Sequence, residues 1–91
     1  MNRLIVAGAL CLAVFAVDAA WAGANCKAYP KAEWMSEADA KTKIVAMGYA
    51  INVFKVDGNC YEIYGRNKDG KKVEIYFDAK TLDVVKSEIE K

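Results

Sequence analysis

The chain has 91 residues, with 13 basic and 12 acidic side chains, a net charge of +1 and no histidine. A charge balance this close to zero gives no electrostatic reason to expect binding to nucleic acid or to an anionic membrane surface. Without histidine, the commonest general base and the commonest metal ligand are both missing. We therefore expect neither an enzyme nor a cofactor or metal site.

The N-terminal segment has the layout of a secretory signal peptide. A positive residue precedes an uncharged apolar run over residues 4–17, and Ala22 ends a small-x-small cleavage pattern. The alternative is a membrane anchor, but a span needs about 20 apolar residues, and Asp18 ends this run early. We expect residues 1–22 to be removed, with Ala24 as a second cleavage point. The protein would then be periplasmic or secreted, without membrane attachment after cleavage.

Two cysteines remain after that cleavage, because Cys11 lies in the apolar run. In an oxidising compartment, the even pair Cys26 and Cys60 predicts a disulfide. By the chain-entropy model, such a bond is worth roughly 3–4 kcal/mol. The alternative, a reactive or metal-binding pair, lacks both the C-x-x-C spacing and any histidine. We divide the rest of the chain into an extended arm, residues 23–33, and a domain, residues 34–91.

The segment after the arm predicts one helix of about three turns. Ser36 is a favourable N-cap, and Asp39 stands where the acidic residue of a capping box stands. Gly48 is suited to end the helix. The apolar stripe expected to face the core consists of Ala40, Ile44, Val45 and Met47.

The second half of the domain predicts strands joined by short turns. Residues 49–56 are rich in β-forming residues, but their alternation is imperfect, which suggests a bulge. Residues 60–78 alternate with period two on both sides of a turn at residues 67–70, as a β-hairpin does. Its apolar face carries Tyr61, Ile63, Gly65, Val73, Ile75 and Phe77, joined by Ile51 and Val84 from the neighbouring strands. Its other face carries Glu62, Tyr64, Lys72, Glu74 and Tyr76.

A second turn at residues 78–83 leads into a short last strand that starts at residues 84–85. The tail, residues 86–91, has no clear assignment as strand, helix end or frayed terminus. Short connections make neighbouring strands antiparallel, and the single helix is the available cover for the apolar sheet face. The predicted fold is therefore α+β: one helix packed on a small antiparallel sheet of three or four strands, with the helix first and a β-meander after it.

The same residues resemble a known family. Trp-Met-Ser-Glu-Ala-Asp-Ala at 34–40, Asp-Gly-Asn-Cys-Tyr-Glu-Ile at 57–63, Asp-Gly-Lys-Lys-Val-Glu-Ile at 69–75 and Asp-Ala-Lys-Thr at 78–81 are similar to the PepSY domain, in particular to its short exported members. The resemblance implies one helix on a small antiparallel sheet and a role in restraining or regulating peptidases. It supplies no catalytic residues. Leu82 departs from the family, which often has glycine there, and predicts a widened turn or an exposed apolar contact.

Together these observations favour a small exported binding or regulatory module, an inhibitor or modulator of a peptidase in the bacterial envelope. Its partner would be that peptidase or another envelope protein. The alternative is an envelope structural or stress protein with no dedicated ligand. The candidate protein-binding face is Glu62, Tyr64, Lys72, Glu74 and Tyr76, with Asn52 and Phe54 at its margin. Tyrosine-rich faces are favoured at interfaces, although an ordinary solvated sheet face with cross-strand pairs explains the same residues.

Overall fold

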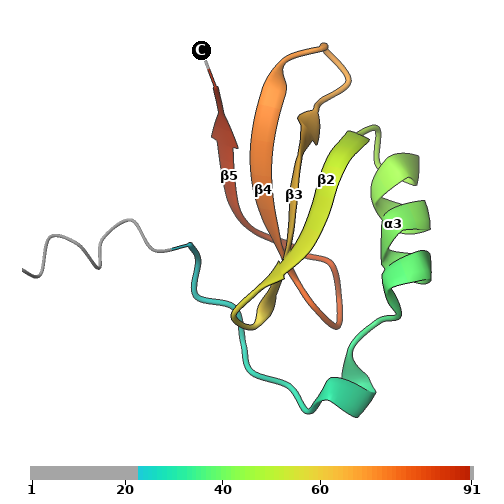
Figure 1. Cartoon of the computed structure of the whole chain (residues 1–91), viewed down its shortest axis with the longest axis vertical. Helices are drawn as coiled ribbons and strands as arrows, with labels where there is room; N and C mark the ends of the chain where they lie inside the picture. The colour runs from blue at the N-terminus through green and yellow to red at the C-terminus, as the bar shows by residue number, and fades with distance from the viewer. Residues whose placement is uncertain (1–22, 91) are drawn as a thin grey trace, which may run out of the picture.

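The computed structural model describes residues 23–90 (Figure 1). The predicted signal segment lies outside the described residues, so its cleavage stays a prediction. The elements are the short 3-10 helix η2 (Lys31–Glu33), the helix α3 (Glu37–Ala46) and the strands β2 (Ala50–Asp57), β3 (Cys60–Arg66), β4 (Lys72–Asp78) and β5 (Val84–Ile89). The sheet order is β2-β3-β4-β5, and each strand is antiparallel to the next. The predicted α+β fold, a helix followed by a β-meander, is confirmed with four strands.

The helix α3 begins where the sequence predicted. The Ser36 hydroxyl accepts a hydrogen bond of 3.1 Å from the backbone N–H of Asp39, which satisfies one of the free donors of the first turn. Ala40 and Ile44, one turn apart, are fully buried. Val45 and Met47 were expected beside them, but both are exposed. That prediction is wrong because the helix buries only the narrow i, i+4 stripe, and Met47 is its C-cap.

The central hairpin pairs as its alternation predicted. Tyr61 lies opposite Phe77, and Ile63 lies opposite Ile75, with all four side chains buried in the core. The turn is closed by the Asn67 side chain, whose Oδ1 accepts hydrogen bonds from two backbone N–H groups, those of residues 69 and 71. These local signals, alternation and turn chemistry, were sufficient to set the register of the two central strands.

The first strand carries the expected irregularity. The register of β2 against β3 shifts between Ile51 and Val53, so that Asn52 is the extra residue of a bulge. The shift keeps both Ile51 and Phe54 packed against the core. Phe54 was expected at the margin of the opposite face, and that prediction is wrong: its ring centroid lies 5.0 Å from that of Tyr61, beneath the helix.

Leu82 occupies a left-handed backbone conformation, with φ at 64°. Its N–H donates a hydrogen bond of 2.9 Å to the carbonyl of Asp78, and its side chain is 2 % exposed. The expected exposed contact is therefore wrong, because the side chain enters the core. Left-handed backbone costs a non-glycine residue about 1–2 kcal/mol. Burial of a leucine side chain recovers about 1.5–3 kcal/mol and offsets that cost.

The last strand is longer than the sequence indicated. Residues up to Ile89 pair with β4, which assigns most of the tail to β5. Val84 was expected on the covered apolar face, but it is exposed, as are Val85 and Ile89. The prediction for Val84 is wrong because α3 lies near β2, at the other side of the sheet from β5 (Figure 1).

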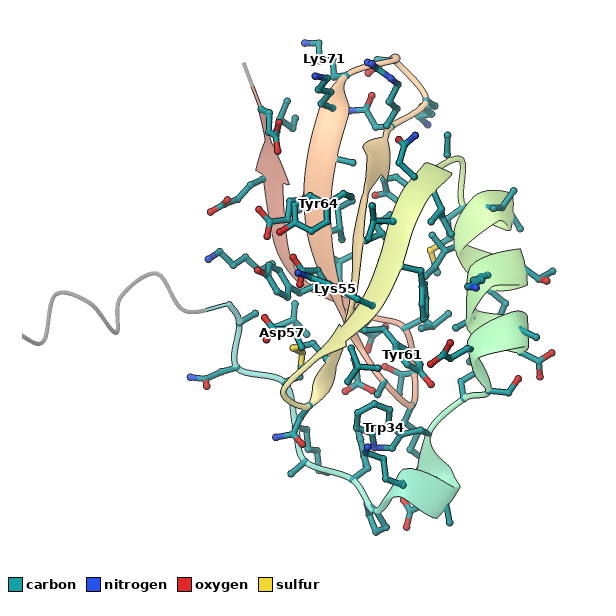
Figure 2. All side chains as sticks on the ribbon, in the orientation of Figure 1. Trp34, Lys55, Asp57, Tyr61, Tyr64 and Lys71 are labelled. Atoms are coloured by element: carbon teal, nitrogen blue, oxygen red, sulfur yellow. A yellow bond between two sulfur atoms is a disulfide. The ribbon has the colours of Figure 1, made fainter. Side chains whose placement is uncertain are left out.

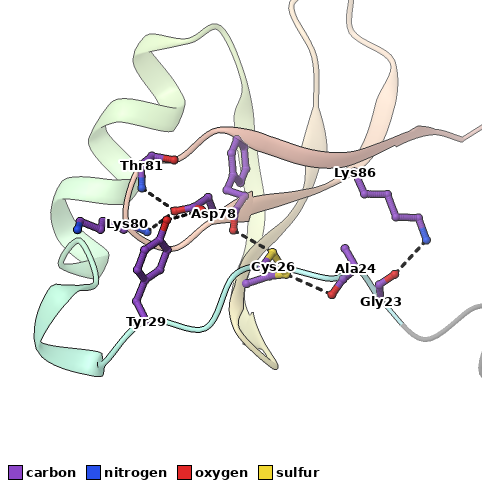
Figure 3. The surroundings of a disulfide bond; sticks show 10 residues. Gly23, Ala24, Cys26, Tyr29, Asp78, Lys80, Thr81 and Lys86 are labelled. Atoms are coloured by element: carbon purple, nitrogen blue, oxygen red, sulfur yellow. Dashed lines mark hydrogen bonds between the residues drawn. A yellow bond between two sulfur atoms is a disulfide. The ribbon is translucent and has the colours of Figure 1, made fainter.

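The N-terminal arm crosses the sheet face that is turned away from α3, here called the outer face. The predicted disulfide joins Cys26 to Cys60, the first residue of β3, with their Cα atoms 5.4 Å apart (Figure 3). Further along the arm, Trp34 packs against the core. Its ring meets that of Tyr61 in an edge-to-face arrangement, with the ring centroids 5.3 Å apart. Residues 23–90 contain no helix with the length and apolarity that a membrane crossing requires.

Candidate interaction face

The outer face is built from alternate residues of the central strands. Antiparallel pairing places Glu62 opposite Tyr76 and Tyr64 opposite Glu74, while Lys72 lies opposite Arg66 at the turn end of the hairpin. Successive side chains of a strand point to opposite faces, so the five residues selected from the sequence lie on one face. The structure therefore brings them together, and it leaves their role in binding as a proposal.

Two of the five residues are far less accessible than a solvated sheet face would leave them. Glu62 is 1 % exposed and Tyr76 is 6 % exposed. The start of the arm lies beside Tyr76, because a Cβ on Gly23 would come within 3.6 Å of its ring. Lys86 holds the arm there: its Nζ donates a hydrogen bond of 3.1 Å to the Gly23 carbonyl (Figure 3). This end of the outer face is therefore internal to the domain.

Glu62 is a buried carboxyl with little compensation. Its closest cation, the Nζ of Lys55, is 3.8 Å from Oε1, and Oε2 has no hydrogen-bond partner within the described part of the chain. Burial raises the pKa of Glu62 above the ordinary carboxyl value. Burial and the unpartnered oxygen favour the protonated, uncharged form of this side chain, and the Lys55 ammonium opposes them in part.

Glu74, on the adjacent strand, is the charged member of the pair. The Tyr76 hydroxyl donates a hydrogen bond of 2.8 Å to its Oε2. The Glu62 carboxyl, which donates when it is protonated, and this phenol together lower the pKa of Glu74. The pKa of Glu62 is thus raised and that of Glu74 is lowered, so Glu62 is the weaker acid of the two carboxyls.

Tyr64 is the partly exposed aromatic side chain of the outer face. The negative charge that Glu62 carries at alkaline pH, followed by desolvation, raises the pKa of Tyr64 to about 12, so the phenol stays neutral well into the alkaline range. The Lys55 ammonium lies 5.1 Å from its ring centroid (Figure 2). Val53, opposite Tyr64 on β2, is exposed. A neutral ring, an aliphatic side chain and a cation therefore adjoin one another at the surface.

A hollow of about 300 Å³ adjoins Tyr64 toward the turn end of the face, lined by Asn52, Tyr64, Gly65, Arg66, Lys72, Val73 and Glu90. Its volume is at the lower limit of small-molecule sites, so it suits one inserted side chain better than a cofactor. The described residues hold no group of three acidic or cysteine side chains placed to bind a metal ion. The arrangement offers polar and apolar contacts and no nucleophile paired with a base.

The sequence missed several residues of this surface. Val53 and Lys55 were not selected, because the imperfect alternation of β2 hid which of its residues share a face with Tyr64. Arg66 was also not selected, although the regular alternation of β3 places it on the same face as Tyr64. The signal was present in the bulge: once Asn52 is counted as the extra residue, Val53 and Lys55 fall on the outer face. We call the surface formed by Val53, Lys55, Tyr64, Arg66 and Lys72 the Tyr64 patch.

The fold defines a class: a small, disulfide-linked α+β domain with one helix on an antiparallel meander. The family described as "Peptidase propeptide and YPEB domain" (PepSY_2) matches residues 5–88, and the chain belongs to this family. No curated protein and no solved structure matches the chain. Membership indicates a regulatory module of the peptidase-propeptide kind.

Proposed function

We propose that this protein is an exported module that binds a peptidase, or another protein of the bacterial envelope, and restrains its activity. Family membership supports the class of function. The Cys26–Cys60 disulfide supports an oxidising compartment, because such bonds persist outside the cytosol. The apolar run and cleavage pattern of residues 1–22 support export.

The observation that carries the proposed binding surface is the composition of the Tyr64 patch. Val53 and Tyr64 supply apolar area, and the three cations Lys55, Arg66 and Lys72 surround it. Interfaces favour aromatic and arginine side chains, and a tyrosine ring buries a large area at a low cost in conformational entropy. The patch therefore suits a partner segment that has an apolar residue next to a carboxylate, with the carboxylate entering the hollow between Arg66 and Lys72.

Glu62 and Tyr76 have a supporting role in this proposal. They are buried, so a partner cannot contact them directly, and the start of the arm lies beside Tyr76. Their contribution is to shape the surface: Tyr76 holds Glu74 through its hydrogen bond, and Glu62 raises the pKa of the Tyr64 phenol further above its ordinary value. Of the candidate face, Tyr64, Lys72 and the exposed part of Glu74 remain for direct contact.

The experiment is affinity capture from an envelope extract with the tagged, oxidised domain. The test variant is Tyr64→Ala combined with Val53→Ala, and the matched control is Val45→Ala combined with Met47→Ala on the exposed side of α3. We expect the wild type and the control to capture the same peptidase or envelope protein and the test variant to lose it. Equal capture by all three proteins would contradict the assignment of the patch, and no capture by any of them would favour a structural or stress role.

A further inference from the structure

The strand β5 is at one edge of the sheet, and on the side away from β4 it has no neighbouring strand among residues 23–90 (Figure 1). This edge also carries the exposed apolar residues Val84, Val85 and Ile89, the last of them 55 % exposed. An unpaired edge presents a row of free N–H and C=O groups, and it is a template for pairing with another strand. The edge therefore has both the backbone groups and the apolar side chains that strand addition requires.

The pairing of β5 with β4 fixes which backbone groups are free. The Glu90 N–H donates a hydrogen bond of 2.9 Å to the Lys72 carbonyl, so even-numbered residues of this stretch direct their backbone groups toward β4. In an antiparallel ladder the intervening residues direct theirs away. Ser87 and Ile89 therefore present their N–H and C=O groups at the open edge.

The charges of β5 are complementary to those of the same strand turned around. Antiparallel pairing of two β5 strands about Ser87 places Lys86 of each copy opposite Glu88 of the other, twice in the dimer. A slide of two residues in one direction sets Lys86 against Lys86 and makes no attractive pair. The opposite slide sets Glu88 against Glu88 and makes two Lys86–Glu90 pairs. Opposite charges across a ladder are favourable and like charges are unfavourable, so the register about Ser87, with two attractive pairs and no repulsive pair, is favoured.

The selected register also satisfies the backbone. Ser87 faces its own counterpart as a hydrogen-bonded pair, because its backbone groups point outward. Lys86 and Glu88 then form the non-hydrogen-bonded pairs, in which the side chains lie closer together. The regular part of β5 ends at Lys86, because the register of β5 on β4 shifts between Lys86 and Val84, so the paired stretch runs from Lys86 to Glu88 with the exposed Ile89 beside it. Lysine and glutamate on an edge ordinarily prevent pairing, but here their order makes the edge complementary to itself.

We propose that two copies of this protein associate through β5 into one continuous eight-stranded sheet, with Ser87 on the two-fold axis. Both α3 helices then lie on the same side of the sheet, and both Tyr64 patches lie on the other side. An edge of six residues is a small interface, so the dimer dissociates on dilution. The proposal is independent of the regulatory function, since it concerns the opposite edge of the sheet from β2.

The test is sedimentation equilibrium of the purified, oxidised protein over a concentration series. Lys86→Glu makes the edge wholly acidic at the paired positions, and Glu88→Lys makes it wholly basic. Each variant alone should lose affinity for itself by roughly tenfold or more, because two attractive pairs become repulsive. An equimolar mixture of the two variants should recover association, because it sets the acidic edge against the basic one. Lys43→Glu on α3 is the matched charge control and should behave as the wild type.

A second variant guards against loss of the fold. Lys86 holds the arm through Gly23 and also forms an ion pair of 3.6 Å with Glu88 of its own strand, so Lys86→Glu removes both contacts, whereas Glu88→Lys removes the ion pair alone. Ser87→Pro removes an N–H that points to solvent and no hydrogen bond within the domain, and it should abolish association while thermal unfolding stays cooperative. A wild type that is monomeric at all concentrations, single variants that associate as tightly as the wild type, or a mixture that stays monomeric would each overturn the proposal.

Discussion

Tyr76 donates its hydroxyl hydrogen bond to Glu74, which lies two residues away on the same strand, while Glu62, opposite Tyr76 on β3, has a carboxylate oxygen with no partner within residues 23–90. One carboxyl of the pair is thus stabilised in its charged form and the other is not. A buried polar group without a partner costs about 1–3 kcal/mol. This asymmetry on the outer face leads to a prediction about stability.

Glu62→Gln should raise the free energy of unfolding at neutral pH by about 1 kcal/mol, since it removes a buried charge and loses only a half-exposed ion pair to Lys55. The pKa of Glu62 is raised in the folded state, so its protonated form supports the fold below the ordinary value of 4.5, and that support is lost as pH rises. The advantage of the variant should therefore appear above pH 4.5 and vanish below it. Urea denaturation at several pH values measures this, and a variant less stable than the wild type at neutral pH would contradict it.

The tyrosine of the patch should ionise late. Because Glu62 and desolvation raise the pKa of Tyr64 to about 12, its phenol should titrate well above the ordinary value of 10.0. The raised value means that the neutral phenol supports the fold below pH 10 and that this support is lost as pH rises through about 12. The ultraviolet absorbance difference between the wild type and Tyr64→Phe, recorded through an alkaline titration, isolates this residue. A difference curve with its midpoint at the ordinary value would count against the described surroundings of Tyr64.

The disulfide should be a major source of stability for so small a domain. Replacing both Cys26 and Cys60 by serine should lower the free energy of unfolding by roughly 3–4 kcal/mol, since the bond constrains a loop with a sequence separation of 34. Thermal unfolding of the oxidised wild type and the double variant measures the effect. Intact mass before and after reduction serves as its control, and it also shows whether the exported protein lacks residues 1–22. An unchanged unfolding midpoint would mean that the cross-link contributes nothing.

Leu82 and Val45 are two residues whose burial in the structure is the reverse of what the sequence predicted. Leu82→Ala should cost roughly 2–5 kcal/mol, because it removes a buried side chain from the core. Val45→Ala should change stability by less than about 0.5 kcal/mol, because Val45 is exposed on α3. Chemical denaturation of both variants gives the comparison. Equal effects would contradict the described burial.

Features of the fold could be predicted from the sequence where they depend on a few neighbouring residues. The hairpin from Cys60 to Asp78 and the start of α3 at Ser36 were predictable because alternation, turn residues and capping act over a few neighbouring residues. Which residues the helix would bury was not predictable, since no residue near Val45 or Val84 indicates where the helix lies across the four strands. The burial of Tyr76 was also not predictable, because it depends on the path of an irregular arm that is fixed only by the tertiary fold.

The same distinction explains the candidate face. Its five residues were correctly placed on one side because the strand period decides that. Their accessibility was misjudged because it depends on tertiary contacts such as that of Lys86 with Gly23. The β2 residues of the Tyr64 patch could be assigned only from the bulge at Asn52, which sets the register of β2 against β3.

The most direct test of the regulatory role is the peptidase activity of an envelope extract, measured with increasing amounts of the oxidised domain. The proposal predicts saturable inhibition by the wild type and by the Val45→Ala, Met47→Ala control, and a rise of at least tenfold in the concentration needed for half-inhibition by Tyr64→Ala, Val53→Ala. Loss of a central aromatic contact of an interface typically costs more than 1 kcal/mol, which corresponds to this order of change. Peptidase activity that is unaffected by the wild-type domain at any concentration would contradict the central claim.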